Sequence, residues 1–228
     1  MRPELRRFGT SQTPIVVIDE FSGDAEQVAR LAEVLAPFPD VSDNYYPGVR
    51  GMIDESQPEA FAYIQKTCQE AAQFIAGAFE IDSFDLLRAS SSMVTKSPSE
   101  LSEPQRAPHF DSTDQKYLAI LHYLRVPEGS GTAFFRQRAT QIERVTKANV
   151  DAFMQRFQMD TLLLSPDSGY IHGSNQFYEQ IGAVEGIADR LVIYQGSLLH
   201  SGIIPSGMSF SDDPREGRLT ANIFVRGH

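Results

Sequence analysis

The order of its elements predicts that this chain folds as an α+β protein that is mainly β. Two segments with helical spacing fall in the first third of the sequence, and most of the strand-like segments follow them, separated by turns. That order favours an antiparallel β-sandwich or jelly roll supported by N-terminal helices over a doubly wound sheet. The sequence also has no glycine-rich phosphate loop and no G-x-S-x-G serine elbow, which argues against nucleotide and acyl-transfer chemistry.

The N-terminal part is expected to form one strand and two supporting helices. The β-branched run "TPIVVIDEF" predicts a strand over 13–21. Asp24 begins an Asp-x-x-Gln capping pattern, and the helix that it starts should end at Pro37. A second helix is expected over 57–79, where apolar residues recur at helical spacing. Between the two helices, residues 38–56 carry turn signals and predict a loop.

The rest of the chain supplies most of the strands. Four segments have the apolar or β-branched character of strands: 85–97, 117–126, 190–200 and 218–227. Residues 138–188 form an insertion, in which a helix is expected across 148–159 and a shorter one near 176–184. The turn-rich segment 201–217 predicts a polar loop between the last two strands.

The length of 228 residues fits one domain of ordinary size with a sizeable core. We therefore expect a single domain over 1–228. Helical support should occupy about 1–82, and the β core about 83–228, with the helical insertion at 138–188.

Composition and charge limit the partners. The formal net charge is -10 and no Lys/Arg-dense segment is present, so a nucleic-acid partner is not expected. The apolar runs are too short to cross a membrane, and the basic N-terminus lacks the apolar stretch of a signal peptide. Cys68 is the single cysteine and falls on a helix face expected to be buried, which excludes an intrachain disulfide and a cysteine-based zinc site. These features predict a reduced, cytoplasmic protein, and they leave its oligomeric state open.

A candidate metal site begins with His109 and Asp111, which stand just before the apolar run at 117–126. In an extended segment, residues i and i+2 point to the same side, so the imidazole and the carboxylate can converge on one ion. Non-haem Fe(II) oxygenases use such a pair together with a second histidine, in a 2-His-1-carboxylate set that leaves coordination positions open. The second histidine must come from elsewhere in the chain.

Position along the predicted strands separates the other histidines. His200 ends the strand "RLVIYQGSLLH" and precedes a loop, where a jelly roll would present a ligand. His122 lies inside an apolar strand and is expected to be a hydrogen-bonded core residue. His172 lies in a loop and could be exposed or line a pocket, and His228 is terminal. His200 is therefore the favoured partner of the metal pair.

An anionic cosubstrate such as 2-oxoglutarate would also need a cation for its distal carboxylate. Arg218 opens the strand that follows the 201–217 loop, and its guanidinium can grip a carboxylate at two points. Thr220 shares its face of that strand by alternation. The segment "NYYPGVRG" offers Tyr45, Tyr46 and Arg50 to a substrate, although a surface loop is the favoured interpretation there.

With these residues in order, the chain resembles the Fe(II)/2-oxoglutarate-dependent dioxygenases of the prolyl-4-hydroxylase type. The resemblance covers roughly 92–135 and 189–226, with a further match at the N-terminal "PIVVIDEF" and its helix. The matching pieces follow the order of the family: "SMVTKSP", "HFD", "HYL", "GSGTAFF", "DRLVIYQGSLLH" and "RLTANIF".

The resemblance implies a double-stranded β-helix core. It implies that His109, Asp111 and His200 are the catalytic iron ligands and that Arg218 pairs with the C5 carboxylate of 2-oxoglutarate. Tyr123 matches the strand tyrosine that assists the same carboxylate. Thr220 remains an ordinary strand residue that could take part.

The activity implied is an oxygenase that uses Fe(II), 2-oxoglutarate and molecular oxygen, releases succinate and CO2, and hydroxylates a small molecule or peptide. Ser97-Pro98 replaces the tyrosine common in relatives, and the 138–188 insertion and the 201–217 loop are long, which argues against a prolyl substrate. The alternatives are a non-catalytic protein that binds a metal or a small acid, and a cupin-like metalloenzyme without 2-oxoglutarate. Arg218 argues against the latter.

Overall fold

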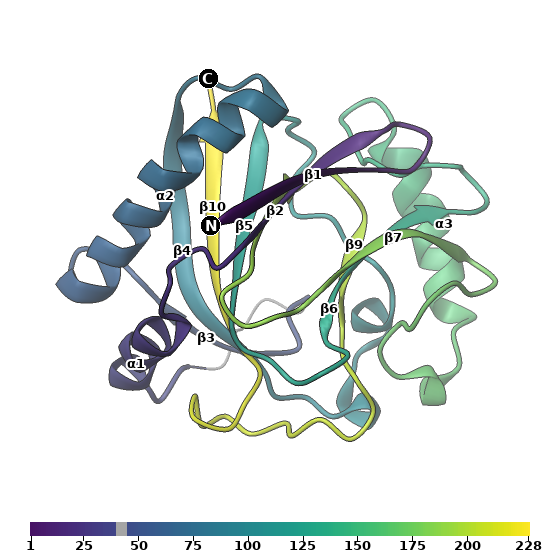
Figure 1. The fold of residues 1–228 in the computed structure, drawn as a ribbon. Helices are drawn as coiled ribbons and strands as arrows, with labels where there is room; N and C mark the ends of the chain where they lie inside the picture. Colours follow the sequence, from purple (N-terminus) through teal and green to yellow (C-terminus); the bar gives the residue numbers. More distant parts are fainter. Residues whose placement is uncertain (40–44) are drawn as a thin grey trace.

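The computed structural model describes residues 1–39 and 45–228 and shows a mainly β protein with two antiparallel sheets (Figure 1). The larger sheet has the strand order β1-β2-β8-β5-β10-β4-β3. Its strands in that order are Arg2–Phe8, Thr13–Asp19, Leu191–Gln195, Tyr117–Arg125, Leu219–Gly227, Phe84–Val94 and Gly48–Met52. The smaller sheet has the order β7-β6-β9, with strands Tyr178–Glu185, Gly131–Gln137 and His200–Ile203.

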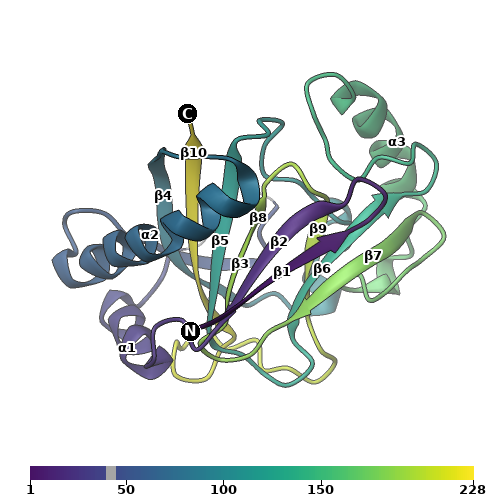
Figure 2. The ribbon, with the colours of Figure 1, turned by 45° about the horizontal axis from the view of Figure 1, so that its top comes forward.

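In the described residues, three α-helices accompany the sheets: α1 (Ala25–Leu35), α2 (Pro58–Phe79) and α3 (Val150–Leu162). Helices α1 and α2 lie on the side of the larger sheet, whereas α3 lies beyond the smaller sheet (Figures 1 and 2). Short 3-10 helices occupy Pro98–Glu100, Glu103–Arg106 and Pro166–Ser168.

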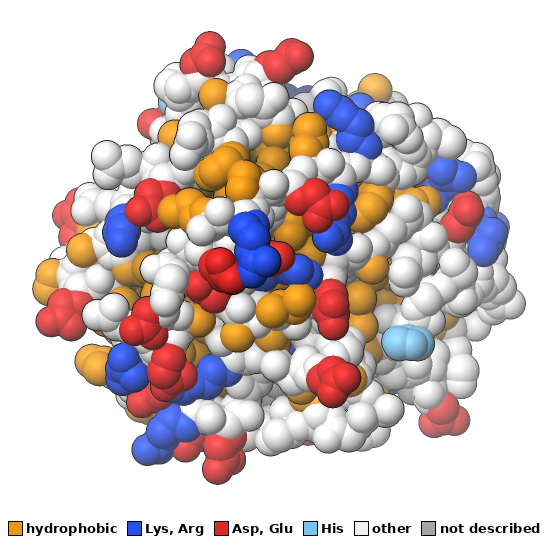
Figure 3. All heavy atoms as spheres, viewed as in Figure 1, with side chains coloured by type: hydrophobic (Ala, Val, Ile, Leu, Met, Phe, Trp, Pro, Cys, Tyr) orange, Lys and Arg blue, Asp and Glu red, His pale blue; other side chains and the backbone are white. Residues whose placement is uncertain are grey.

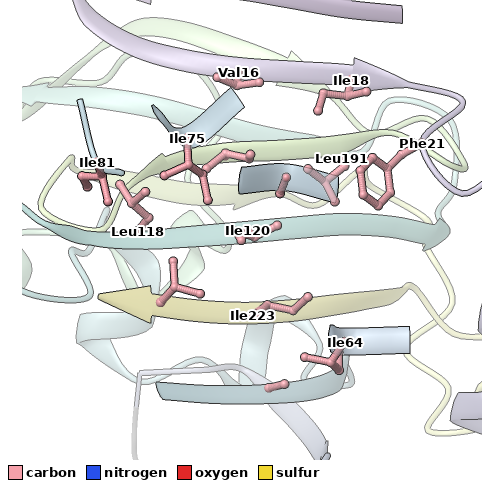
Figure 4. Packing of buried hydrophobic residues seen from close by; sticks show 14 of the residues in the cluster. Val16, Ile18, Phe21, Ile64, Ile75, Ile81, Leu118, Ile120, Leu191 and Ile223 are labelled. Carbon is pink, nitrogen blue, oxygen red and sulfur yellow. The ribbon is translucent and has the colours of Figure 1, made fainter. Parts of the chain in front are cut away.

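The main core lies between α2 and the larger sheet (Figure 4). Ile64 and Ile75 of α2 are fully buried against Ile120 of β5 and Ile223 of β10, which are paired across the sheet. Burying such a side chain contributes about 1.5–3 kcal/mol relative to leaving it exposed. Packing against α2 therefore holds β5 and β10 in place.

Alternation along β10 gives the larger sheet two different faces. Ala221, Ile223 and Val225 belong to the cores under the helices. Thr220 and Asn222, which alternate with them, line a cavity on the opposite face. The same sheet therefore carries an apolar core on one side and the candidate site on the other.

Seven of the predicted elements are confirmed. The strand over 13–21 is β2, and the helices after Asp24, over 57–79 and across 148–159 are α1, α2 and α3. Asp24 accepts a hydrogen bond from the Gln27 backbone N–H, as the capping pattern predicts. The other confirmed elements are the strands β4, β5 and β10.

The predicted short helix near 176–184 is wrong, because those residues form β7 and pair with β6. The insertion is therefore helical only in part, with α3 as its helix. A local reason is Gly182, which disfavours a helix. A Cβ at Gly182 would lie 2.4 Å from Cγ of Phe8, so the strand approaches that ring more closely than a larger residue would allow.

The segments 1–12 and 38–56 contain strands that the sequence analysis did not predict. β1 at Arg2–Phe8 is mostly exposed and pairs only with β2 among the described strands, so it lacks an apolar pattern. β3 at Gly48–Met52 pairs with β4, and a Cβ at Gly48 would lie 1.9 Å from the Met93 carbonyl oxygen. The expected helical support over 1–82 thus also contributes three strands. The rest of the predicted loop includes 40–44, outside the described residues.

The predicted strand 190–200 is two strands in different sheets. β8 ends at Gln195 in the larger sheet and β9 begins at His200 in the smaller one. The turn between them carries the chain from one sheet to the other, which sets His200 between the two sheets.

One face of the molecule carries mixed charge. Acidic and basic side chains are interspersed over the face in Figure 3, without a basic stripe. Within the part of the chain that the structure describes, no helix has the length and apolar character needed to cross a bilayer.

Candidate metal centre and its cavity

Backbone hydrogen bonds bring the three predicted metal ligands together. His109 and His200 exchange both of their backbone hydrogen bonds, with N···O distances of 2.9 and 2.8 Å. The Asp111 backbone N–H donates to the Gly196 carbonyl at 2.7 Å. A Cβ at Gly196 would lie 2.6 Å from Cδ1 of Tyr117 and 3.1 Å from the Asp111 Cβ, so this turn requires glycine. The segment from His109 to Asp111 is thus fixed against the turn before β9.

The side chains of the three residues form a compact donor set. One ligand atom from each of His109, Asp111 and His200 lies within 4.8 Å of the others. The His200 Nε2 lies 3.6 Å from the Asp111 Oδ2, and the two imidazole centroids are 4.3 Å apart. His200 Nδ1 lies 2.7 Å from the Leu198 carbonyl oxygen, which can only accept, so Nδ1 carries the proton. The Nε2 lone pair is therefore available to a metal.

The environment of this set fits a divalent metal. Asp111 Oδ2 is buried and has no hydrogen-bond partner among the described residues. Burial raises the pKa of Asp111, and burial, with the neighbouring His200 and Arg50, lowers the pKa of His109. A buried carboxylate oxygen without a donor is costly by itself. A metal cation would bind both this oxygen and a neutral imidazole, because metal ligands must be deprotonated. A 2-His-1-carboxylate set is the donor set of non-haem Fe(II) oxygenases.

The donor set opens onto a cavity between the two sheets. The cavity has about 880 Å³ of empty space when its open mouth is counted. Its floor includes Leu121 of β5 and Asn222 of β10, and its opposite wall includes Thr132 of β6 and Ser201 of β9. The face of the larger sheet away from α1 and α2 is therefore hollow beside the three predicted metal ligands.

Arg218 lies in the same cavity, directly before β10. The residue is 5% exposed, its Nε donates to Ser130 Oγ at 2.7 Å, and its Nη2 lies 3.3 Å from the Gly131 carbonyl oxygen. Both acceptors are neutral, so the buried guanidinium has no carboxylate partner in the described part of the chain. Such a charge is costly unless an anion joins it.

Thr220 lines the cavity, as its alternation with Arg218 predicts. Tyr123 is fully buried and is not one of the described residues that line the cavity. Its hydroxyl and that of Thr132, which does line the cavity, are 2.7 Å apart, and its ring centroid is 5.8 Å from the Arg218 Cζ. A direct contact of Tyr123 with a ligand remains a prediction, while the structure places this residue behind Arg218 and Thr132.

Comparison with known protein families decides the family. Residues 1–225 match the model described as "Family of unknown function (DUF6445)". The chain belongs to the DUF6445 family. A search of curated proteins found no match.

Solved structures show the fold of this DUF6445 protein. It resembles the non-heme alpha ketoglutarate dependent epimerase SnoN from nogalamycin biosynthesis (15% identity, TM-score 0.55, 95% of this chain and 80% of that chain). It also resembles HygX from Streptomyces hygroscopicus with nickel and 2-oxoglutarate bound (12%, 0.54, 95% and 84%). A prolyl hydroxylase from Trichoplax adhaerens, in complex with a hypoxia inducible factor peptide, matches too (13%, 0.52, 93% and 83%). The predicted resemblance to 2-oxoglutarate and Fe(II) oxygenases is confirmed in the fold.

The remaining histidines of the DUF6445 protein lie outside the donor set. His122 is a buried core residue, as predicted, with Nδ1 2.7 Å from the Tyr63 hydroxyl and Nε2 3.0 Å from Asp189 Oδ1. His172 is exposed. His228 lies 3.1 Å from the exposed carboxylate of Asp85. Of the five histidines, only His109 and His200 join the described metal cluster.

Three residues of the cavity were missed by the sequence interpretation: one was not considered, and two were assigned to a surface loop. Tyr194 of β8 packs its ring edge-on to His200, with centroids 4.8 Å apart. Alternation along 190–200 could have placed it on the cavity face. Tyr46 and Arg50 line the cavity too, although a surface loop was favoured there. The sequence did not predict β3, whose pairing with β4 brings this segment to the cavity.

Proposed function

We propose that this DUF6445 protein is an Fe(II)- and 2-oxoglutarate-dependent oxygenase that hydroxylates a small-molecule or peptide substrate. The observation that carries the proposal is the His109–Asp111–His200 cluster opening onto the cavity that also holds the buried cation of Arg218. The two antiparallel sheets would form the double-stranded β-helix, in one domain over 1–228.

The proposal gives a task to six residues of the cavity. His109, Asp111 and His200 would hold Fe(II), with His200 oriented by the Leu198 carbonyl. Arg218 would bind the distal carboxylate of 2-oxoglutarate, and the hydroxyls of Thr132 and Thr220 would flank it. Iron bound there with 2-oxoglutarate supplies the oxidising chemistry, with oxygen as cosubstrate and succinate and CO2 as products.

Apolar residues after β9 would keep water out of this chemistry. Ile204 lines the cavity and packs with Met208 and Val94. Phe210 stacks on Tyr170, with ring centroids 6.3 Å apart. Excluding water strengthens the electrostatic contacts inside the site and prevents side reactions.

The test is the visible absorption of the protein with Fe(II) and 2-oxoglutarate in the absence of oxygen. The wild type should show a weak charge-transfer band, and His109→Ala and His200→Ala should lose it. His172→Ala is the matched control and should keep the band, because His172 is exposed and outside the cluster. A band that survives His109→Ala or His200→Ala would show that the ligand assignment is wrong.

Admission of oxygen separates an enzyme from a binding protein. A catalytic site should convert 2-oxoglutarate to succinate, slowly without substrate and faster with it. A protein that shows the band and binds 2-oxoglutarate but forms no succinate with any candidate substrate would be a non-catalytic member. A protein that binds the metal but not 2-oxoglutarate would be a metalloprotein of another class.

A further inference from the structure

The cavity holds a second cation, Arg50. Arg50 lies on β3 opposite Ser92 of β4, at the edge of the larger sheet. Both Arg50 and Arg218 line the cavity, whereas Asp111 is the single carboxylate among the described lining residues. Asp111 belongs to the metal cluster, so the cavity offers more positive charge than its own carboxylate can balance.

The guanidinium of Arg50 is poorly satisfied within the protein. It makes no ion pair with any residue in 1–39 or 45–228, and its Nε is buried without a hydrogen-bond partner there. Its Cζ lies 4.1 Å from the ring centroid of Tyr46. A cation–π contact of this kind contributes about 0.5–2 kcal/mol, which offsets only part of the cost of burying a charge.

Tyr46 adds a second unsatisfied donor beside Arg50. Its hydroxyl is buried and, within the described chain, makes no hydrogen bond of normal geometry, with the Ser92 side chain as a polar neighbour. Buried polar groups in native proteins are normally hydrogen-bonded, so two neighbouring donors without acceptors indicate a ligand that supplies acceptors. An anion with two oxygens is the acceptor that a guanidinium and a hydroxyl share best.

With Fe(II) and 2-oxoglutarate bound, the charges of the site would balance without Arg50. Two positive charges of Fe(II) are met by Asp111 and by one carboxylate of 2-oxoglutarate. The other carboxylate is met by Arg218. Arg50 then remains as an unbalanced cation in the cavity, and its pairing with a further anion would remove the imbalance.

We propose that Arg50, with the Tyr46 hydroxyl, binds a carboxylate of the substrate, so that the substrate is an organic acid. The inference rests on the proposed function, because it assigns 2-oxoglutarate to Arg218. Tyr45, Val94, Tyr170 and Phe224 line the same cavity and suit an apolar body attached to the acid. The substrate class is therefore a monocarboxylic acid with an apolar or aromatic body.

The experiment uses matched acids and amides as probes. The protein is loaded with Zn(II) and 2-oxoglutarate, which prevents turnover, and binding is measured by saturation-transfer NMR. The probes are a panel of aryl and alkyl monocarboxylates, each with its primary amide; phenylacetate and phenylacetamide are one such pair. We expect at least one acid to bind about tenfold or more tightly than its amide, as for a charge-assisted pair.

Variants assign that preference to Arg50. Arg50→Gln should remove the preference for the acid, and Tyr46→Phe should reduce it. Arg30→Gln is the matched control, because it removes the same charge from a side chain that is 57% exposed, and it should keep the preference. Circular dichroism checks that each variant is folded, and Arg50→Lys keeps the charge if Arg50→Gln does not fold.

Binding of 2-oxoglutarate is measured on the same samples. It should be unchanged in Arg50→Gln and weakened in Arg218→Ala. Loss of 2-oxoglutarate binding in Arg50→Gln, with the acid preference intact, would assign Arg50 to the cosubstrate and overturn the proposal. So would a wild type that binds none of the acids, or binds them no better than the amides. If the wild type fails to bind Zn(II) and 2-oxoglutarate at all, the proposed function itself fails.

Discussion

Replacing Asp111 by Asn should separate metal binding from folding. Asn has nearly the same shape and keeps the backbone hydrogen bond from residue 111 to Gly196. The substitution removes a carboxylate whose Oδ2 is buried and without a hydrogen-bond partner in the described structure. The metal-free variant should therefore be at least as stable as the metal-free wild type, although it should bind metal much more weakly.

The magnitudes follow from these two effects. The Asn amide is also a buried polar group, so metal-free Asp111→Asn should gain only the cost of burying the charge, at most about 1–3 kcal/mol. A metal at about 100 times its Kd stabilises the wild type by about 2.7 kcal/mol, and the variant should lose most of this. Urea unfolding with EDTA and with Zn(II) or Fe(II) measures both quantities.

The control for this experiment is Asp85→Asn, which makes the same change of charge at a carboxylate that is 71% exposed. It should keep the metal-dependent stabilisation. If Asp111→Asn loses as much stability in EDTA as it loses in metal, the carboxylate supports the turn and not a metal, and the site assignment fails.

Three other substitutions have defined outcomes. Burial raises the pKa of Glu143, but hydrogen bonds from Ser11, Thr10 and Arg136 outweigh it and hold the pKa at about 2. The resulting stabilisation, about 3 kcal/mol, is present above the ordinary pKa near 4.5 and is lost as the pH falls toward 2. Unfolding of Glu143→Gln should lack this pH dependence. Asp189→Ala should cost about 1–3 kcal/mol in urea unfolding, because it leaves the buried His122 and the part-buried Ser22 N–H without their acceptor. Arg218→Ala should weaken 2-oxoglutarate about tenfold or more by calorimetry, with metal affinity unchanged.

Local sequence pattern was enough to predict those residues of the candidate site that lie close together in the sequence. His109 and Asp111 are two residues apart, and Arg218 and Thr220 alternate on one strand, so strand geometry alone predicts a shared side. The structure brings all four to one cavity. His200 needed the order of the strands as well, since its neighbours in space are far away in sequence.

Strand pairing could not be predicted from local pattern. β1 and β3 are edge strands, whose residues need not alternate between apolar and polar, and β7 is a strand only because β6 pairs with it. The role of Arg50 was hidden for the same reason. Its segment reads as a turn-rich loop until β3 pairs with β4 and presents the side chain to the cavity.

Two His–Asp pairs in this fold show how a structural pair differs from a candidate functional one. Asp189 accepts hydrogen bonds from the backbone N–H groups of Ser22 and Gly23 and lies 3.0 Å from His122, so against burial its pKa is lowered. Asp111 lies 3.6 Å from His200, keeps an oxygen without a donor in the described chain, and has a raised pKa because of burial. The first pair satisfies its own charge and stabilises the fold. In the second pair, the Asp111 oxygen and the His200 Nε2 lone pair face a cavity and receive no hydrogen bond in the described chain, as expected of residues that bind a cation.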